Sequence, residues 1–147
     1  MADLRELYQS VIIDHGKNPR NFHKLGHPSC CAEGYNPLCG DQLKLYLNLE
    51  NDVVLDACFE GNGCAISQAS ASLMTEQLKG KTVTEVKELF AKVHLMLTEN
   101  VTDTESLGKI AVLSGVREFP ARVKCATLAW HTLIAALNQQ HEPVSTE

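Results

Sequence analysis

Two segments of alternating apolar and polar residues, joined by a short polar turn, constrain the fold most. Leucines occupy every second position from 43 to 49, and a second alternating segment runs from Val53 to Phe59 after Glu50-Asn51-Asp52. Because successive side chains of a strand point to opposite faces, this pattern predicts an antiparallel hairpin with one buried face. Residues 32–35 predict a third, short strand.

The rest of the chain supplies helices that can cover the buried face. Apolar residues at helical spacing predict helices over residues 4–16, 65–80, 82–97 and 120–137, and a shorter one at 105–113. The last of these is apolar on two sides, which is typical of a helix buried between neighbours. We therefore predict an α+β fold, a small antiparallel three-stranded sheet packed against about five helices, as a single domain over residues 1–147.

Composition excludes several classes of protein. The chain is 44% hydrophobic and 21% charged, which is typical of a globular protein. Its net charge of −5 argues against a nucleic-acid partner, because phosphates are bound by clustered Lys and Arg. No apolar segment approaches the roughly 20 residues that span a bilayer, and the N-terminus lacks the pattern of a secretory signal. We expect a cytoplasmic protein with no membrane partner.

Six cysteines in a reducing compartment are expected to be metal ligands, nucleophiles or buried apolar residues rather than disulfide partners. Cys30 and Cys31 are adjacent and have no ligand-type residue at metal-site spacing, so we interpret them as structural. Cys58 is predicted to be a partly exposed strand residue. Cys39, Cys64 and Cys125 differ from these because each falls at the boundary of a predicted element.

The predicted hairpin brings part of this second group together. The start of its first strand and the end of its second lie at the same edge, so Cys39, Asp41 and Cys64 are expected to be neighbours. Gly40, Gly61 and Gly63 permit the close backbone approaches that ligand loops need. Cys64 also opens a helix, whose dipole favours its thiolate.

Three thiolates and one carboxylate form a tetrahedral ligand set suited to Zn²⁺. Arg122 and Lys124, beside Cys125, are placed to offset its negative charge. From spacing alone, however, scattered core cysteines are an equally good interpretation. None of the six histidines has ligand spacing to a partner, and His15 is interpreted as a helix cap or surface residue.

Four motifs resemble the U-type iron–sulfur cluster assembly family, which comprises IscU, SufU and the N-terminal domain of NifU. They are Pro19-Arg20-Asn21, Asn36-Pro37-Leu38-Cys39-Gly40-Asp41, Gly61-Asn62-Gly63-Cys64-Ala65-Ile66-Ser67 and Phe119-Pro120-Ala121-Arg122-Val123-Lys124-Cys125-Ala126-Thr127-Leu128-Ala129-Trp130. The resemblance covers nearly the whole chain. It implies that Cys39, Asp41, Cys64 and Cys125 form the metal site.

Two differences indicate the SufU branch. The IscU branch has a His directly before the third cysteine and a Leu-Pro-Pro-Val-Lys motif just upstream. This chain has Lys124 at the first place and Glu118-Phe119-Pro120-Ala121-Arg122 at the second. Residues 99–114 resemble the extra region of SufU. The resemblance then implies sulfurtransferase-like, zinc-dependent transfer: persulfide sulfur passes from a SufS-type cysteine desulfurase to Cys39 and on to downstream iron–sulfur assembly proteins. Arg122 would orient the acceptor or the zinc ligands.

Two alternatives remain open. The same four ligands would hold iron or a transient [2Fe–2S] cluster, which would make the protein a scaffold that delivers clusters to apo-proteins. Alternatively, zinc is purely structural and the protein is an interaction module. Structural zinc sites are usually all Cys and His, so the carboxylate argues against this last interpretation.

Overall fold

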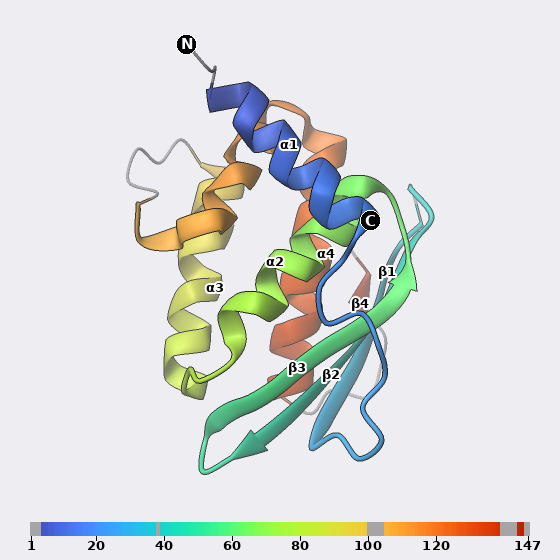
Figure 1. The fold of residues 1–147 in the computed structure, drawn as a ribbon, viewed down its shortest axis with the longest axis vertical. Coiled ribbons are helices and arrows are strands. Elements are labelled where there is room, and N and C mark those ends of the chain that lie inside the picture. Colours follow the sequence, from blue (N-terminus) through green and yellow to red (C-terminus); the bar gives the residue numbers. More distant parts are fainter. Residues whose placement is uncertain (1–3, 38, 100–104, 139–143, 146–147) are drawn as a thin grey trace.

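The computed structural model describes residues 4–37, 39–99, 105–138 and 144–145 (Figure 1). The elements in chain order are α1 (Leu4–Lys17), β1 (Cys30–Asn36), β2 (Asp41–Glu50), β3 (Val53–Asn62), α2 (Ala65–Leu78), α3 (Val83–Thr98), the 3₁₀ helix η1 (Glu105–Glu118), α4 (Pro120–Leu137) and β4 (Val144–Ser145). The predicted α+β class with five helices is confirmed.

The sheet has the strand order β3-β2-β1-β4. Strands β1, β2 and β3 are antiparallel, as predicted, with Cys30 opposite Leu47 and Leu45 opposite Phe59. The two-residue strand β4 pairs in parallel with β1, an addition that the sequence did not predict. It lies in the tail that follows α4, and residues 139–143 and 146–147 of that tail are outside the described part of the chain.

The hairpin turn fixes the register between β2 and β3. Asn51 and Asp52 both have positive φ, 53° and 63°, which is the backbone of a two-residue type I′ turn and suits Asn and Asp. A register shift lies between Asn48 and Leu49. At the far end of the hairpin Gln42 pairs with Asn62, so the first residues of β2 lie beside the last residues of β3.

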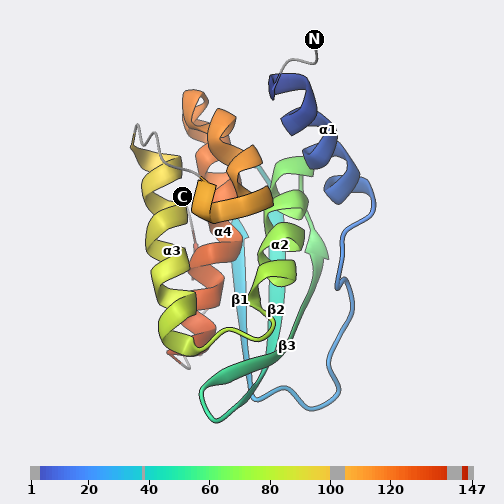
Figure 2. The same ribbon diagram turned by 60° about the vertical axis from the view of Figure 1, so that its left-hand side comes forward.

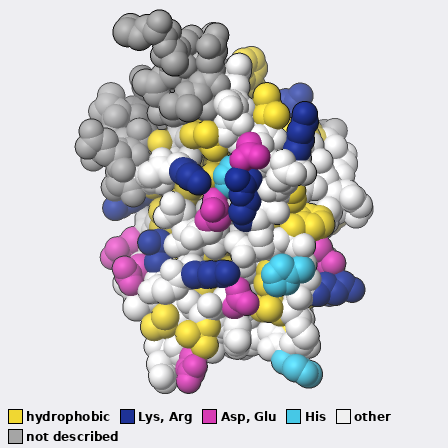
Figure 3. Space-filling model, viewed as in Figure 1, with side chains coloured by type: hydrophobic (Ala, Val, Ile, Leu, Met, Phe, Trp, Pro, Cys, Tyr) yellow, Lys and Arg dark blue, Asp and Glu magenta, His cyan; other side chains and the backbone are white. Residues whose placement is uncertain are grey.

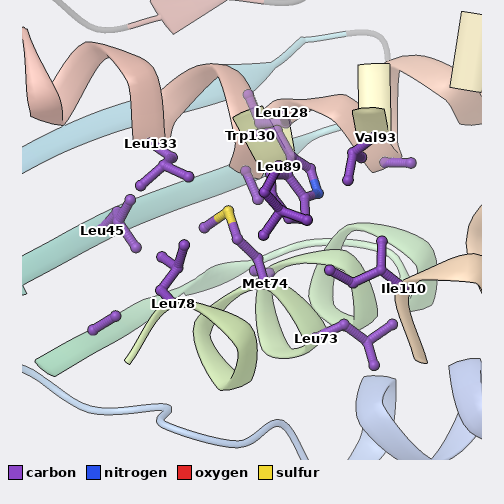
Figure 4. Close-up of a cluster of buried hydrophobic side chains, with 14 of the residues drawn as sticks. Leu45, Leu73, Met74, Leu78, Leu89, Val93, Ile110, Leu128, Trp130 and Leu133 are labelled. Atoms are coloured by element: carbon purple, nitrogen blue, oxygen red, sulfur yellow. The ribbon is translucent and has the colours of Figure 1, made fainter. Parts of the chain in front are cut away.

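Helices cover one face of the sheet. Figure 2 shows α2 and α4 against the sheet and α3 further out, in agreement with the contacts of α4 with β1, β2, α2 and α3. The leucines at 43, 45 and 47 point to this layer and are buried. Figure 4 shows Trp130 beside Met74, and its Nε1–H donates to Ser70 Oγ (3.1 Å). The predicted burial of the last helix between its neighbours is correct.

One helical prediction differs in detail. The predicted third helix, α3, begins with a capping box in which Thr82 and Glu85 exchange hydrogen bonds of 3.1 Å each. The helix expected at 105–113 extends to Glu118 as a 3₁₀ helix with a break at Gly108. Ile110, Leu113 and Val116 of η1 are buried. Their burial against the helical layer explains why this region is longer than its local pattern indicated.

The prediction of a partly exposed Cys58 is wrong, because its exposed fraction is 0%. Its strand, β3, is not an open edge: the segment after α1 runs alongside it, and the Phe59 N–H donates to the carbonyl of Asn21 (3.0 Å). Burial accordingly raises the pKa of the Cys58 thiol. A strand pattern shows which face a residue is on but not which distant segment covers that face.

The interpretation of His15 as a cap or surface residue is also wrong. Its exposed fraction is 1%, and its Nδ1 lies 2.7 Å from Ser72 Oγ on α2. The backbone N–H of Arg20 donates to the same hydroxyl (2.8 Å). The end of α1 is thereby fixed to the middle of α2, and burial lowers the pKa of His15.

Surface charges of opposite sign are mixed. Ion pairs join Arg20 to Asp14 (2.7 Å) and Lys79 to Asp56 (3.3 Å). Figure 3 shows basic and acidic side chains interspersed on the face that it views, without a continuous basic stripe there. Among the described residues, no helix has the length and apolarity needed to cross a bilayer.

Candidate metal centre

Three of the four residues expected at the metal site form one group. Cys39 lies in the turn between β1 and β2, Asp41 is the first residue of β2, and Cys125 lies in the second turn of α4. Their possible ligand atoms all lie within 4.8 Å of one another. The thiols of Cys125 and Cys39 are 3.2 Å apart, with Cys125 as donor. Residues 86 positions apart in the chain thus meet at one end of the sheet.

Cys64 adjoins this group. It is the N-cap of α2, and its Sγ accepts a hydrogen bond from the Ser67 N–H (3.4 Å). Its own backbone N–H donates to Asp41 Oδ1 (2.9 Å), although its thiol is not among the possible ligand atoms that lie within 4.8 Å of one another. The prediction that the hairpin brings the Asp41 and Cys64 loops together is therefore correct, and the expected helix N-terminus is the environment of the Cys64 thiol.

The electrostatics of Cys125 favour a neutral thiol unless a cation compensates. Burial raises the pKa of Cys125 far above its ordinary range, and hydrogen bonds with Cys39 and Asp41 and the nearby Cys64 raise it further. Thiolate is nevertheless the form that binds metals. A bound cation would reverse this preference, so metal binding here should release protons.

The donor set fits a small transition-metal ion. Sulfur ligands favour zinc and iron over magnesium or calcium. A Zn–S bond of about 2.3 Å places two tetrahedral ligands about 3.8 Å apart, which the group within 4.8 Å reaches with small side-chain adjustments. Three thiols and one carboxylate would complete four-coordination without a further protein ligand.

Sequence reasoning missed one residue of this centre. The side chain of Asn36 is 0% exposed, and its Nδ2 donates to Asp41 Oδ2 (3.5 Å) and to Cys125 Sγ (3.6 Å). The available signal was its position, because Asn36 continues the buried face of β1 that carries Ala32 and Gly34. A polar side chain on such a face needs a polar partner.

The remaining predicted residues lie outside the group. Arg122 is exposed on the first turn of α4, and Lys124 is half-buried. Cys30 is buried on the helix-covered face of β1, whereas Cys31 is exposed on the opposite face. Among the described residues, neither belongs to the group of possible ligands.

Comparisons with known proteins agree with the resemblance found in the sequence. A model of the NifU-like N terminal domain matches residues 7–138. The zinc-dependent sulfurtransferase SufU of Bacillus subtilis (strain 168) is 47% identical over 135 residues, 90% of each chain. The iron–sulfur cluster assembly scaffold protein IscU of Thermotoga maritima is 41% identical, over 93% of this chain and 96% of its own.

A crystal structure shows the same fold. It is that of a putative iron–sulfur cluster assembly scaffold protein for the SUF system from Fervidobacterium islandicum AW-1, with a TM-score of 0.84 and 38% identity over 90% of this chain and 98% of that one. The match to the family model, over residues 7–138, includes both the hairpin that carries Asp41 and the helix that carries Cys125. This chain therefore belongs to the NifU-like N-terminal domain family, together with the SufU and IscU assembly proteins.

Proposed function

We propose that this protein is a zinc-dependent sulfur-transfer protein of iron–sulfur cluster assembly, which accepts persulfide sulfur from a cysteine desulfurase. The observation that carries the proposal is the convergence of the Cys39 and Cys125 thiols and the Asp41 carboxylate within 4.8 Å at one end of the sheet, with Cys39 exposed and with the Cys64 backbone N–H bonded to Asp41. The identity with the SufU sulfurtransferase supports zinc and sulfur transfer as its chemistry.

Cys39, Asp41, Cys64 and Cys125 would hold the zinc ion. Bound zinc supplies a positive charge that keeps thiols deprotonated near neutral pH. The protein contributes a buried carboxylate, a thiol at a helix N-terminus and a buried thiol on α4. Asp41 is the hardest of the four donors, and it lies in the same loop as Cys39.

Cys39 is the proposed sulfur acceptor because it is the most accessible of the three thiols. It is exposed in a turn, whereas Cys64 is half-buried and Cys125 is fully buried. In the transfer, the Cys39 thiolate attacks the outer sulfur of the desulfurase persulfide. A new S–S bond forms on Cys39, the old S–S bond breaks, and the cysteine of the desulfurase leaves as a thiolate.

Arg122 is proposed to orient the acceptor or the zinc ligands from the exposed first turn of α4. The partners we propose are a SufS-type desulfurase and downstream iron–sulfur assembly proteins. A reducing cytoplasm suits this chemistry, because the thiols must remain free between transfers.

The test compares two exposed cysteines. Zinc-loaded Cys39→Ala and Cys31→Ala variants are incubated with a cysteine desulfurase and cysteine, and desulfurase turnover and the sulfur content of each cysteine peptide are measured. Cys39→Ala should lose both stimulation and the added sulfur, whereas Cys31→Ala should retain both. Equal stimulation by Cys39→Ala would show that this residue is not the acceptor.

A second function has support from the relatives named IscU. The same donor set is compatible with a transient [2Fe–2S] cluster, and the T. maritima scaffold is 41% identical. Anaerobic reconstitution followed by transfer to an apo-ferredoxin tests this alternative. Rapid transfer of an intact cluster from this protein, without sulfur uptake on Cys39 in the zinc form, would favour the scaffold function.

A further inference from the structure

We propose that Asn36 is a positioning residue whose side-chain amide orients Asp41 and Cys125 as metal ligands, so that Cys39 would be the most reactive thiol of the centre. The proposal rests on the zinc-dependent transfer proposed above and adds an order of reactivity among its thiols. It concerns a residue that is expected neither to bind the metal nor to accept sulfur.

The contacts of Asn36 set it apart from the other side chains of β1. It is completely buried, and its single amide nitrogen reaches both a carboxylate oxygen (Asp41 Oδ2, 3.5 Å) and a sulfur (Cys125 Sγ, 3.6 Å). Burying an amide is unfavourable unless it is hydrogen-bonded. Its placement between two expected metal ligands therefore points to a role at the centre rather than in the core.

The hydrogen bonds divide the four expected ligands into held and releasable ones. Both oxygens of Asp41 have donors, since Oδ1 accepts from the Cys64 N–H and Oδ2 from Asn36. Cys125 contacts Asn36 and is buried on a helix, and Cys64 is fixed by Ser67. Cys39 instead sits exposed in a turn, with its thiol against that of Cys125.

Asn36 also anchors that turn through its backbone. Its carbonyl accepts a hydrogen bond from the Cys39 N–H (3.3 Å). A substitution of the side chain leaves this backbone bond in place, so the effect of the amide can be measured separately. Donors to metal-ligating carboxylates and thiolates orient those ligands and stabilise their charge, and their loss typically weakens metal binding 10- to 100-fold.

The experiment removes the amide at two positions. Asn36→Leu keeps a similar volume without a donor, and Gln42→Leu removes an exposed amide directly beside Asp41. Zinc affinity is measured by competition with a chelator. Zinc-loaded proteins are then treated with N-ethylmaleimide, and the modification rates of the Cys39 and Cys125 peptides are compared by mass spectrometry.

The unmutated protein and Gln42→Leu should be modified at Cys39 well before Cys125. Asn36→Leu should bind zinc about 10- to 100-fold more weakly, and the ratio of the two rates should fall by about tenfold or more. Zinc affinity within about twofold of the unmutated protein, with the same order of modification, would overturn the proposal.

The same variants are also tested for loss of folding stability, as a control. Unfolding of the metal-free variants by urea measures any purely structural role, and Asn36→Ala replaces Asn36→Leu if the leucine prevents folding. Reduced stability of the metal-free protein with an unchanged order of modification would also overturn the proposal. An unmutated protein that binds zinc but takes up no sulfur would refute the proposed function alone, whereas one that binds no zinc would refute both.

Discussion

Gly63 provides a test of the centre that changes none of its expected ligands. The residue lies between the end of β3 and the N-cap Cys64, and a Cβ placed on it would lie 2.9 Å from Asp41 Oδ1 and 3.1 Å from Ser67 Oγ. Side chains essentially never make so short a contact. We predict that Gly63→Ala displaces the Asp41 carboxylate or the Cys64 amide that holds it.

The structure sets the size of the effect. Asp41 is completely buried and its Oδ1 is bound to the Cys64 N–H at 2.9 Å, so the carboxylate has little room to retreat. Overpacking costs about 1–3 kcal/mol, and loss of a hydrogen bond to a charged group costs about 1.5–3 kcal/mol. Because these effects overlap, we expect the free energy of unfolding to fall by about 2–5 kcal/mol.

Urea unfolding with and without zinc is the assay, and Gly26→Ala is the matched control, since a Cβ there meets nothing within 4 Å. The control should change stability by less than about 0.5 kcal/mol. Zinc at 100 times its dissociation constant should add about 2.7 kcal/mol to the unmutated protein, and each tenfold loss of affinity in Gly63→Ala should remove about 1.4 kcal/mol of that gain. Equal stabilities of the two variants in both conditions would refute the packing of Asp41 described here.

Three further predictions concern the body of the fold. Burial lowers the pKa of His15 below its usual 6.5, so as the pH falls the imidazole is protonated in the unfolded chain before it is protonated in the folded protein. The contribution of neutral His15 to the free energy of unfolding should therefore be fully present above about pH 6.5 and should decrease as the pH falls towards the folded-state pKa. His15→Gln should make the free energy of unfolding, measured with urea, less dependent on pH in this range. Trp130→Phe removes the donor to Ser70 Oγ and should lower the free energy of unfolding by about 1–3 kcal/mol, whereas an unchanged midpoint would contradict the observed bond. Cys58→Ser places a hydroxyl in a buried position and should cost about 1–3 kcal/mol, while Cys31→Ser on the exposed side should cost less than about 0.5 kcal/mol by the same measurement.

Local patterns in the sequence were sufficient to predict the main helices and strands. Alternation of leucines predicted β2, the polar turn at Asn51 and Asp52 predicted the hairpin, and apolar residues at helical spacing predicted α3. These signals depend on residues that are close in sequence. The burial of Cys58 and His15 was predicted wrongly because burial depends on segments that are far apart in the sequence, such as α1 and α2 around His15.

The candidate centre could also be predicted only in part from local patterns. Antiparallel pairing alone placed Asp41 near Cys64, and the structure shows a direct bond between them. No periodicity placed Cys125 beside Cys39, because that contact depends on how α4 crosses the sheet. The contacts of Asn36 with Asp41 and Cys125 were missed for the same reason, since these two residues lie beyond its own strand.

The sequence by itself determined the hairpin, the helices and the family, because alternation, capping and motif order are local properties of the chain. The tertiary structure decided which thiol is exposed and which is held. Cys39 and Cys125 have the same chemistry, but one lies in a turn and the other on a helix buried against the sheet. Burial and hydrogen bonding, rather than residue type, therefore distinguish the proposed sulfur acceptor from the other expected ligands.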